Sequence, residues 1–320
     1  MAPWRKLDTT SNEKNKMKIT ITGATGFIGK YLVEELLAQG NQLTLLGRDF
    51  ERLRSNFGES EQNGISLVQT EYDNDLPRIL EGAEAIVHLS GLRWLKDKVL
   101  QDYITNNVTP TEHLYSAAAK NGIKNVIFLS TIAVYNPRIN PSPLLEDIDC
   151  YPPTHYGLSK LLCEKIGNYY TSEFGLKIKN LRVGQVIGLG ERQGFMLAEF
   201  IRRAAAKEAL AVFGDGTGAR DYIYVFDVVS AILLALRHPE SSGVYNISLG
   251  KPVTHLQLAE TVNRAFDNPG NLDTFPDKPQ DKSKQWMSCE RAWKELGWQP
   301  RWDLDEMFAD MAGKFVLQSN

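Results

Sequence analysis

From Met17 onward, short runs of β-branched and aliphatic residues alternate with longer segments whose apolar residues recur at helical spacing. The apolar runs are KITIT, QLTLL, ISLVQ, EAIVHLS, NVIFLS and NLRVG. The helical segment GKYLVEELLAQ follows the first run and ends at Gly40, a residue suited to the left-handed turn back to a strand. Such alternation is typical of a parallel sheet with helices on both faces. The pattern therefore predicts a doubly wound α/β fold.

Three glycines stand between the first apolar run and the first helical segment. Gly23, Gly26 and Gly29 have the spacing Gly-x-x-Gly-x-x-Gly in KITITGATGFIGKYL. Glycines at such positions permit a tight turn, a close approach of the backbone to a diphosphate, and close packing of helix on strand. The N-terminus of the following helix offers free N–H groups to an anion. The motif predicts a dinucleotide-binding loop of the Rossmann type.

The alternation becomes irregular after about residue 185, where Pro and Gly are frequent. Two later segments, YIYVFDVVSAILLAL and VYNIS, are expected to return to the main sheet. The first sixteen residues are polar and lack the apolar core of a signal peptide. We therefore expect a flexible leader (1–16), a dinucleotide-binding domain (17–184 with about 222–248) and a smaller, partly discontinuous C-terminal substrate-binding lid (185–221 and 249–320).

Composition narrows the class of protein. A net charge of -3 over 320 residues gives no basic footprint for nucleic acid. No stretch approaches the roughly 20 apolar residues that cross a bilayer. Three scattered cysteines are too few for a disulfide framework or a cysteine zinc site, so they are expected to be reduced thiols. We expect a cytoplasmic globular protein with neither a metal site nor a membrane or nucleic-acid partner.

The segment HYGLSK places Tyr156 and Lys160 four residues apart, on one face if the segment is helical. A lysine beside a phenol favours the phenolate and would lower the tyrosine pKa from its usual value of about 10. Such a tyrosine could exchange protons near neutral pH. Because the chain has 12 Tyr, one such pair is expected by chance about as often as not. The neighbouring sequence must therefore decide whether the pair is catalytic.

Those surroundings form an ordered series of motifs. After the glycine loop come HLSG, Asn107, LSTIAVY, YGLSK, LRVGQVIGLG, GARDYIYVFDV, VYNIS and LGWQP. The series, over about residues 17 to 300, resembles the extended short-chain dehydrogenase/reductases of the NAD-dependent epimerase/dehydratase family. Members act mostly on nucleotide-activated sugars, so the resemblance implies a nucleotide-sugar substrate. The oligomeric state stays open, with a homodimer as one candidate.

The resemblance implies a Thr-Tyr-Lys site. Thr131 matches the hydroxyl residue that hydrogen-bonds the reacting sugar oxygen, with Ser130 as the nearby alternative. Tyr156 matches the general acid/base, and Lys160 matches the residue that lowers its pKa and holds the nicotinamide ribose. Asn107 matches an asparagine that supports the lysine. The residues expected to bind the cofactor are Gly23, Thr25, Gly26, Phe27, Ile28, Gly29, Arg48, Leu89, Ser90, Gly91, Asn107, Tyr156 and Lys160.

Three further residues are expected to bind the substrate together with Thr131. Arg220 matches an arginine that clamps the substrate diphosphate, a task suited to a bidentate guanidinium. The alternative for Arg220 is a surface ion pair with Asp221 or Asp215. Gln185 stands where the family usually has a shorter asparagine, and Arg93 is placed to line the sugar pocket.

The end of the second predicted strand bears on the choice of cofactor. An acidic residue there would bind the adenosine ribose hydroxyls and select NAD. The sequence LTLLGRD instead places Gly47 and Arg48 there, and Arg48 could pair with a 2'-phosphate. We therefore expect NADP, with NAD as the alternative in which Asp49 takes the ribose.

The residues after Thr131 bear on the reaction. A 4,6-dehydratase of this family would carry an Asp-Glu pair there, whereas this chain has Ile132 and Ala133, which cannot titrate. The remaining reaction type is hydride transfer at a hydroxyl-bearing or ketone carbon. A keto-sugar nucleotide reductase is the first candidate, and a 4-epimerase with tightly bound NAD is the second. The third is a non-catalytic NADP-binding regulatory protein, against which the presence of Thr131, Tyr156 and Lys160 argues.

Overall fold

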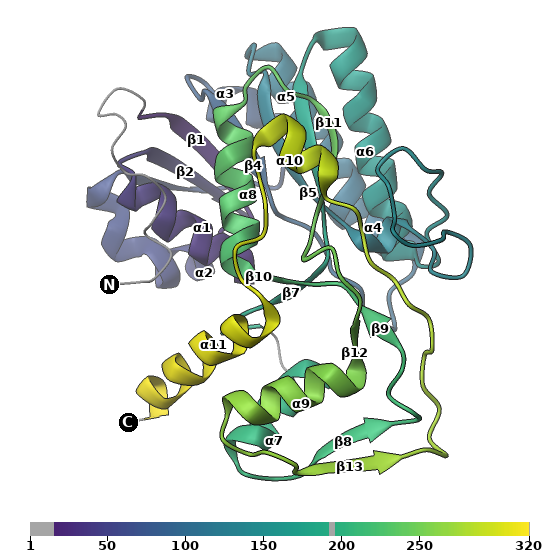
Figure 1. Ribbon diagram of the computed structural model, residues 1–320. Helices are drawn as coiled ribbons and strands as arrows, with labels where there is room; N and C mark the ends of the chain where they lie inside the picture. The colour runs from purple at the N-terminus through teal and green to yellow at the C-terminus, as the bar shows by residue number, and fades with distance from the viewer. Residues whose placement is uncertain (1–15, 192–195, 320) are drawn as a thin grey trace. The chain divides into compact units, whose positions relative to one another are not determined.

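The computed structural model describes residues 16–191 and 196–319 (Figure 1). All of the expected leader except Lys16 lies outside these residues. Within them the chain divides into two compact units. The first comprises the residues up to Val134, Pro152–Arg182 and Val229–Tyr245, and the second comprises Tyr135–Tyr151, Val183–Val228 and the residues from Asn246 onward. The division of cofactor and substrate binding between two domains stays a prediction.

The first unit is built on a seven-stranded sheet with the order β11-β6-β5-β4-β1-β2-β3. The strands are β1 (Lys18–Thr22), β2 (Gln42–Gly47), β3 (Ile65–Gln69), β4 (Ala85–His88), β5 (Asn125–Thr131), β6 (Lys177–Val183) and β11 (Gly243–Ile247). The pairs β1·β2, β2·β3, β1·β4 and β4·β5 are parallel. The strand order reverses between β1 and β4, and in such sheets ligands bind at the carboxyl ends of the strands at that point. The predicted doubly wound α/β fold is confirmed.

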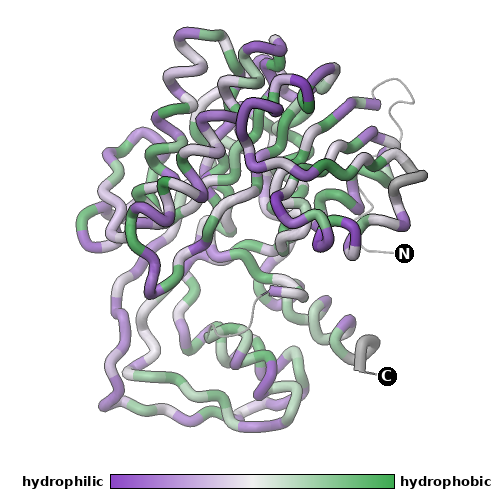
Figure 2. Tube along the Cα trace, turned by 180° about the vertical axis from the view of Figure 1, so that it is seen from behind, coloured by the Kyte–Doolittle hydropathy of each residue, from purple (hydrophilic) through white to green (hydrophobic). Residues whose placement is uncertain are grey.

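Helices connect these strands. They are α1 (Phe27–Ala38), α2 (Phe50–Phe57), α3 (Leu76–Ile79), α4 (Leu100–Tyr103), a π-helix (Ile104–Val108), α5 (Thr109–Lys120), α6 (His155–Phe174) and α8 (Val225–Arg237). Short 3₁₀ segments cover Gly58–Asn63 and Ile132–Val134. Figure 2 shows the chain trace from behind, coloured by the hydropathy of each residue, with hydrophobic and hydrophilic residues alternating along it.

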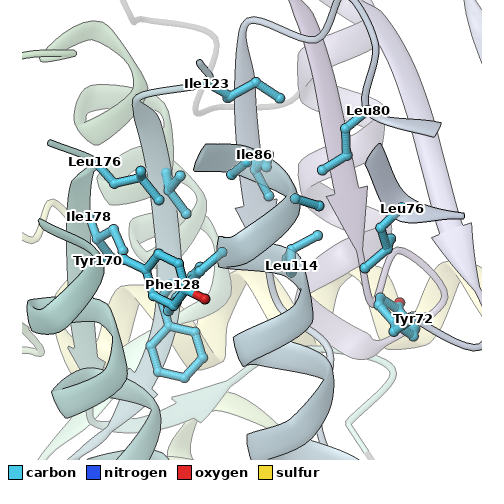
Figure 3. Packing of buried hydrophobic residues seen from close by; sticks show 14 of the residues in the cluster. Tyr72, Leu76, Leu80, Ile86, Leu114, Ile123, Phe128, Tyr170, Leu176 and Ile178 are labelled. Carbon is cyan, nitrogen blue, oxygen red and sulfur yellow. The ribbon is translucent and has the colours of Figure 1, made fainter. Parts of the chain in front are cut away.

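One face of the sheet packs against α3, α5 and α6 through a buried hydrophobic cluster (Figure 3). The strands contribute residues such as Ile86 and Phe128, and the helices contribute Leu76, Leu114 and Tyr170. All five are at most 6% exposed. Burial on this scale fixes α5 and α6 against β4 and β5. All three candidate catalytic residues lie on two of these elements, β5 and α6.

The second unit contains three two-stranded sheets, which pair β7 with β10, β9 with β12 and β8 with β13. Its strands are β7 (Gln185–Ile187), β8 (Leu210–Phe213), β9 (Ala219–Arg220), β10 (Tyr222–Tyr224), β12 (Val253–Thr254) and β13 (Leu272–Phe275). Its helices are α7 (Met196–Ala205), α9 (His255–Ala265), α10 (Glu290–Leu296) and α11 (Leu304–Ser319). The buried Asp221 side chain joins two of its loops by accepting hydrogen bonds from Gly250 N at 3.1 Å and Met287 N at 2.8 Å.

The two late segments expected in the main sheet differ in outcome. VYNIS forms β11 at the edge of that sheet, as predicted. For the strand in YIYVFDVVSAILLAL the expectation is wrong, because β10 pairs with β7 in a separate sheet. Only three residues of the segment are extended, and the remainder from Val225 to Arg237 is helical. Within residues 16–191 and 196–319, no helix has the length and apolar character to span a membrane.

Candidate active site

The glycine loop lies between β1 and α1, where the sequence predicts it. Gly23 has a φ of +75°, and a Cβ there would lie 2.7 Å from Ser90 N. A Cβ on Gly29 would lie 2.3 Å from Gly23 O. Both positions therefore require glycine. Gly26 is the N-cap of α1 and provides no side-chain cap, so the helix N-terminus keeps N–H groups for a ligand. This cradle fits the diphosphate of a dinucleotide.

Other residues predicted to bind the cofactor lie around the same loop. Thr25 is within it, and Phe27 and Ile28 form the first turn of α1. Leu89, Ser90 and Gly91 follow β4, and Ser90 N donates to Thr22 Oγ1 at 3.2 Å. This bond joins the carboxyl ends of β1 and β4 at the point where the strand order reverses.

Asn107 connects the segment after β4 to α6. It lies in the π-helix Ile104–Val108, a form often found at functional sites, and is only 2% exposed. Its Oδ1 accepts from Leu92 N at 2.6 Å, and its Nδ2 donates to Leu92 O at 3.1 Å and to Ser159 Oγ at 2.9 Å. A Cβ on Gly91 would lie 3.2 Å from Asn107 Oδ1 and 3.4 Å from Lys160 Nζ. Asn107, Gly91 and Lys160 are therefore close neighbours.

Thr131, Tyr156 and Lys160 come together at the end of β5 and the start of α6. Thr131 ends β5, and Tyr156 lies in the first turn of α6, whose N-cap Thr154 accepts from Gly157 N at 3.1 Å. The Thr131 side chain hydrogen-bonds the Tyr156 phenol. The Lys160 Nζ donates to Leu129 O at 2.9 Å and is 4.6 Å from the centroid of the Phe128 ring. The structure thus brings together the three residues predicted to be catalytic.

The protonation of this group is set mainly by burial. Burial raises the pKa of the Tyr156 phenol, although its hydrogen bond to Thr131 and the charge of Arg93 act in the opposite direction. Burial also lowers the pKa of Lys160. The expectation that Lys160 lowers the Tyr156 pKa below its usual value is therefore wrong for this arrangement. Desolvation dominates, and the Lys160 ammonium points to a backbone carbonyl.

Two residues beside Tyr156 shape its surroundings. The charge of Arg93, predicted to line the sugar pocket, acts on the Tyr156 phenol. The Tyr103 ring centroid is 6.2 Å from that of Tyr156. The Tyr103 hydroxyl donates to Arg93 O at 3.3 Å and accepts from Leu95 N at 3.1 Å. Sequence reasoning missed Tyr103, because nothing in its local sequence distinguishes it from the other tyrosines.

At the end of β2, Arg48 and Asp49 already have partners. The Arg48 Nη1 donates to Asn106 Oδ1 at 2.8 Å. Asp49 is the N-cap of α2, and its Oδ1 accepts from Arg52 N at 2.9 Å. The assignment of Arg48 to the cofactor stays a prediction.

Gln185 and Arg220, predicted to bind the substrate, belong to the second unit. Gln185 is exposed at the start of β7. The Arg220 Nη1 donates to Ala219 O and Ser283 O, each at 2.8 Å, and its Nη2 lies 2.6 Å from Asp281 Oδ2. Arg220 thus forms an ion pair with Asp281 and with neither of the two partners weighed from sequence, because Asp221 is buried and accepts backbone bonds and Asp215 pairs with Lys282. The substrate-binding roles of Gln185 and Arg220 stay predictions.

A buried histidine that the sequence analysis did not single out lies beneath the site. His88 is 2% exposed and hydrogen-bonds Thr22 Oγ1 at 2.6 Å and Thr111 Oγ1 at 2.9 Å. Thr111 in turn donates to Asn107 O at 2.6 Å. Burial, and to a lesser extent the Lys160 charge, lower the pKa of His88 to about 3, so the ring is neutral at pH 7. It connects β1 to α5 through two neutral hydrogen bonds.

Comparison with known proteins agrees with this geometry. The chain is 28% identical to the UDP-glucose 4-epimerase of Pisum sativum, over 92% of this chain and 95% of that protein. It resembles the crystal structure of UDP-N-acetylglucosamine 4-epimerase from Bacillus cereus, with a TM-score of 0.83, 29% identity, and coverage of 95% and 98%.

A second solved structure from Bacillus cereus is UDP-glucuronic acid 4-epimerase in complex with UDP-glucuronic acid and NAD. It has a TM-score of 0.80 and 25% identity to this chain, with coverage of 95% and 100%. Residues 19–248 match the family described as the NAD dependent epimerase/dehydratase family. The chain therefore belongs to this family, the extended short-chain dehydrogenase/reductases suggested by its motifs.

Proposed function

We propose that this protein is a nucleotide-sugar 4-epimerase that uses NAD and acts on UDP-hexoses. The observation that carries the proposal is the convergence of Thr131, Tyr156 and Lys160 beside a dinucleotide cradle. The relatives described above are 4-epimerases of UDP-sugars. They support the epimerase, the second candidate from sequence, over the keto-sugar reductase that sequence alone favoured.

In this proposal the chain moves a proton at the sugar C4 oxygen. The Tyr156 phenolate takes the proton from the C4 hydroxyl as the carbon is oxidised, and returns it when the 4-keto group is reduced from the other side. NAD, when bound, would accept the hydride from C4 and give it back to the opposite face. Thr131 holds the same oxygen by a hydrogen bond. One proton and one hydride leave and return, so the reaction needs no net oxidant.

Positive charge near Tyr156 favours its deprotonated form, which the first half of the reaction requires. Burial opposes that form, because it raises the pKa of the phenol. The Arg93 charge counters burial directly. Lys160, on the same helix face, would bind the nicotinamide ribose. Turnover should therefore rise with pH as Tyr156 loses its proton.

The cofactor proposal departs from the expectation of NADP. The Arg48 guanidinium already donates to an uncharged amide, Asn106, and Asp49 caps α2. The UDP-glucuronic acid 4-epimerase relative is described with NAD. We therefore assign NAD to the cradle formed by the glycine loop and the N-terminus of α1. An epimerase must keep its reduced cofactor between half-reactions, so the nucleotide should stay bound during turnover.

The test is a pair of measurements on the purified protein. One identifies the nucleotide released on denaturation, and the other follows UDP-glucose, UDP-N-acetylglucosamine and UDP-glucuronic acid without added cofactor. We expect stoichiometric NAD and formation of a C4 epimer. If no epimer forms, and a UDP-4-keto-hexose supplied with NADPH is reduced with one NADPH consumed per turnover, the reductase would be established instead.

Tyr156→Phe provides the residue-level test. It should fold and bind NAD normally but turn over about a hundredfold more slowly, because the ring still packs while the acid/base group is gone. Tyr169→Phe is the matched control, since Tyr169 lies on the same helix and is 54% exposed. It should behave as wild type. Equal activities in the two variants would contradict the role of Tyr156.

A further inference from the structure

Glu164 is a buried carboxylate on α6, one helical turn after Lys160, and it is 2% exposed. Ser130 Oγ donates to its Oε1 at 2.5 Å. Arg182 donates from Nε to Oε1 at 3.0 Å and from Nη2 to Oε2 at 2.7 Å. Arg182 is itself 4% exposed, so the fork-like pair is almost completely shielded from water.

The three partners come from the elements that form the site. Ser130 immediately precedes Thr131 at the end of β5, Glu164 lies on α6 after Lys160, and Arg182 lies on β6. The carboxylate therefore joins the end of β5 to α6. Because Thr131 and Tyr156 lie on these two elements, their alignment depends on this connection.

The charged groups around Lys160 show why the carboxylate also matters electrostatically. His88 on β4 is neutral at pH 7, since burial lowers its pKa to about 3. Cys163 on α6 is a neutral thiol, because burial raises its pKa. Cys163 and, after it, Glu164 are the neighbours that raise the pKa of Lys160 and partly offset burial, and Glu164 is the one of the two that is held in an ion pair as a carboxylate. Arg182 forms an ion pair with the Glu164 carboxylate.

We propose that Glu164 is a positioning residue that keeps Lys160 in its ammonium form and holds Thr131 in line with Tyr156. The proposal rests on the proposed function for the roles of these three residues. Its electrostatic part predicts that Lys160 loses its proton at a lower pH once the Glu164 charge is removed. NAD binding and turnover, which both use the ammonium, should then fail at a lower pH.

The experiment compares Glu164→Gln, which keeps the shape but removes the charge, with Glu164→Asp, which keeps the charge. The dissociation constant of NAD is measured by equilibrium dialysis from pH 7 to 10.5, and kcat and KM are measured over the same range. NAD binding and kcat should both fall at high pH, and we call this fall the basic limb of each pH profile. In Glu164→Gln we expect the basic limb of both profiles to lie about one pH unit lower. The limb should keep its wild-type position in Glu164→Asp, and KM for the nucleotide sugar should stay within about twofold.

A folded Glu164→Gln protein with the wild-type limb would overturn the proposal, as would equal shifts in the two variants. If Glu164→Gln does not fold because Arg182 is left unpaired, Glu164→Gln/Arg182→Met removes both charges and should also show a downward shift, smaller than that expected for Glu164→Gln because the Arg182 cation is removed as well. An unshifted limb there would also overturn it. NAD binding needs no sugar, so a wild type that epimerises nothing would reject the proposed function while the NAD profile still tests Glu164.

Discussion

Gly157 is the position where a single methyl group should disturb the site most. A Cβ there would lie 2.1 Å from Ala133 O, in the 3₁₀ turn that follows Thr131, whereas ordinary contacts begin near 3.4 Å. Gly157→Ala must therefore separate the start of α6 from the end of β5 by about 1.3 Å. Tyr156 is the adjacent residue, and a misplacement of about 1 Å can cost about a hundredfold in rate. We expect kcat to fall by that order.

The control is Gly167→Ala, another buried glycine on the same helix. A Cβ there would meet Ile178 and Tyr115 side chains at 3.5 Å, an ordinary contact. Alanine in a helix interior is favoured over glycine by roughly 0.5–1 kcal/mol, so this variant should keep its activity and its thermal stability. The assay compares kcat and melting temperature in both variants. Gly157→Ala with the activity of Gly167→Ala would refute the close packing of α6 on the turn after β5.

Three further substitutions test other parts of the site. Lys160→Ala should weaken NAD binding and lower kcat together, measured by dialysis and initial rates, because the nicotinamide ribose loses its ammonium partner; unchanged NAD binding would contradict this role of Lys160. Arg48→Ala should change NAD affinity by less than about threefold, and a loss confined to NADPH, on the order of ten- to a hundredfold, would restore the NADP assignment. His88 has a folded-state pKa of about 3, below the unfolded value of about 6.5, so its stabilisation is present above pH 6.5 and lost as pH falls. In urea unfolding, the free energy of unfolding of wild type should fall by about 2 kcal/mol more than that of His88→Gln between pH 7 and 5. Equal losses in the two proteins would contradict the low pKa of His88.

The fold could be predicted from sequence because its signals are local and repeated. Each buried parallel strand is a short apolar run, and the glycine loop marks the first crossover. The strand Tyr222–Tyr224 could not be placed, because three apolar residues fit any sheet and its partner, Gln185–Ile187, is distant in sequence. Register between such short strands is decided by tertiary packing.

The candidate catalytic residues could also be predicted, because the Tyr156 and Lys160 spacing places both on one helix face. Their protonation states could not be predicted from the sequence. Burial raises the pKa of Tyr156 and lowers that of Lys160, and burial depends on the whole surrounding core. The Glu164–Arg182 pair was missed for a similar reason, since it joins residues on α6 and β6 that look like surface charges in sequence.

The most direct test of the central claim uses UDP-glucose carrying deuterium at C4, incubated with the purified protein without added nucleotide. We expect the C4 epimer with deuterium retained at C4, because the hydride leaves to bound NAD and returns while Tyr156 exchanges only the hydroxyl proton. The same protocol applies to UDP-N-acetylglucosamine and UDP-glucuronic acid labelled at C4. Replacement of the label by solvent hydrogen, or the absence of any C4 epimer from all three sugars, would contradict it.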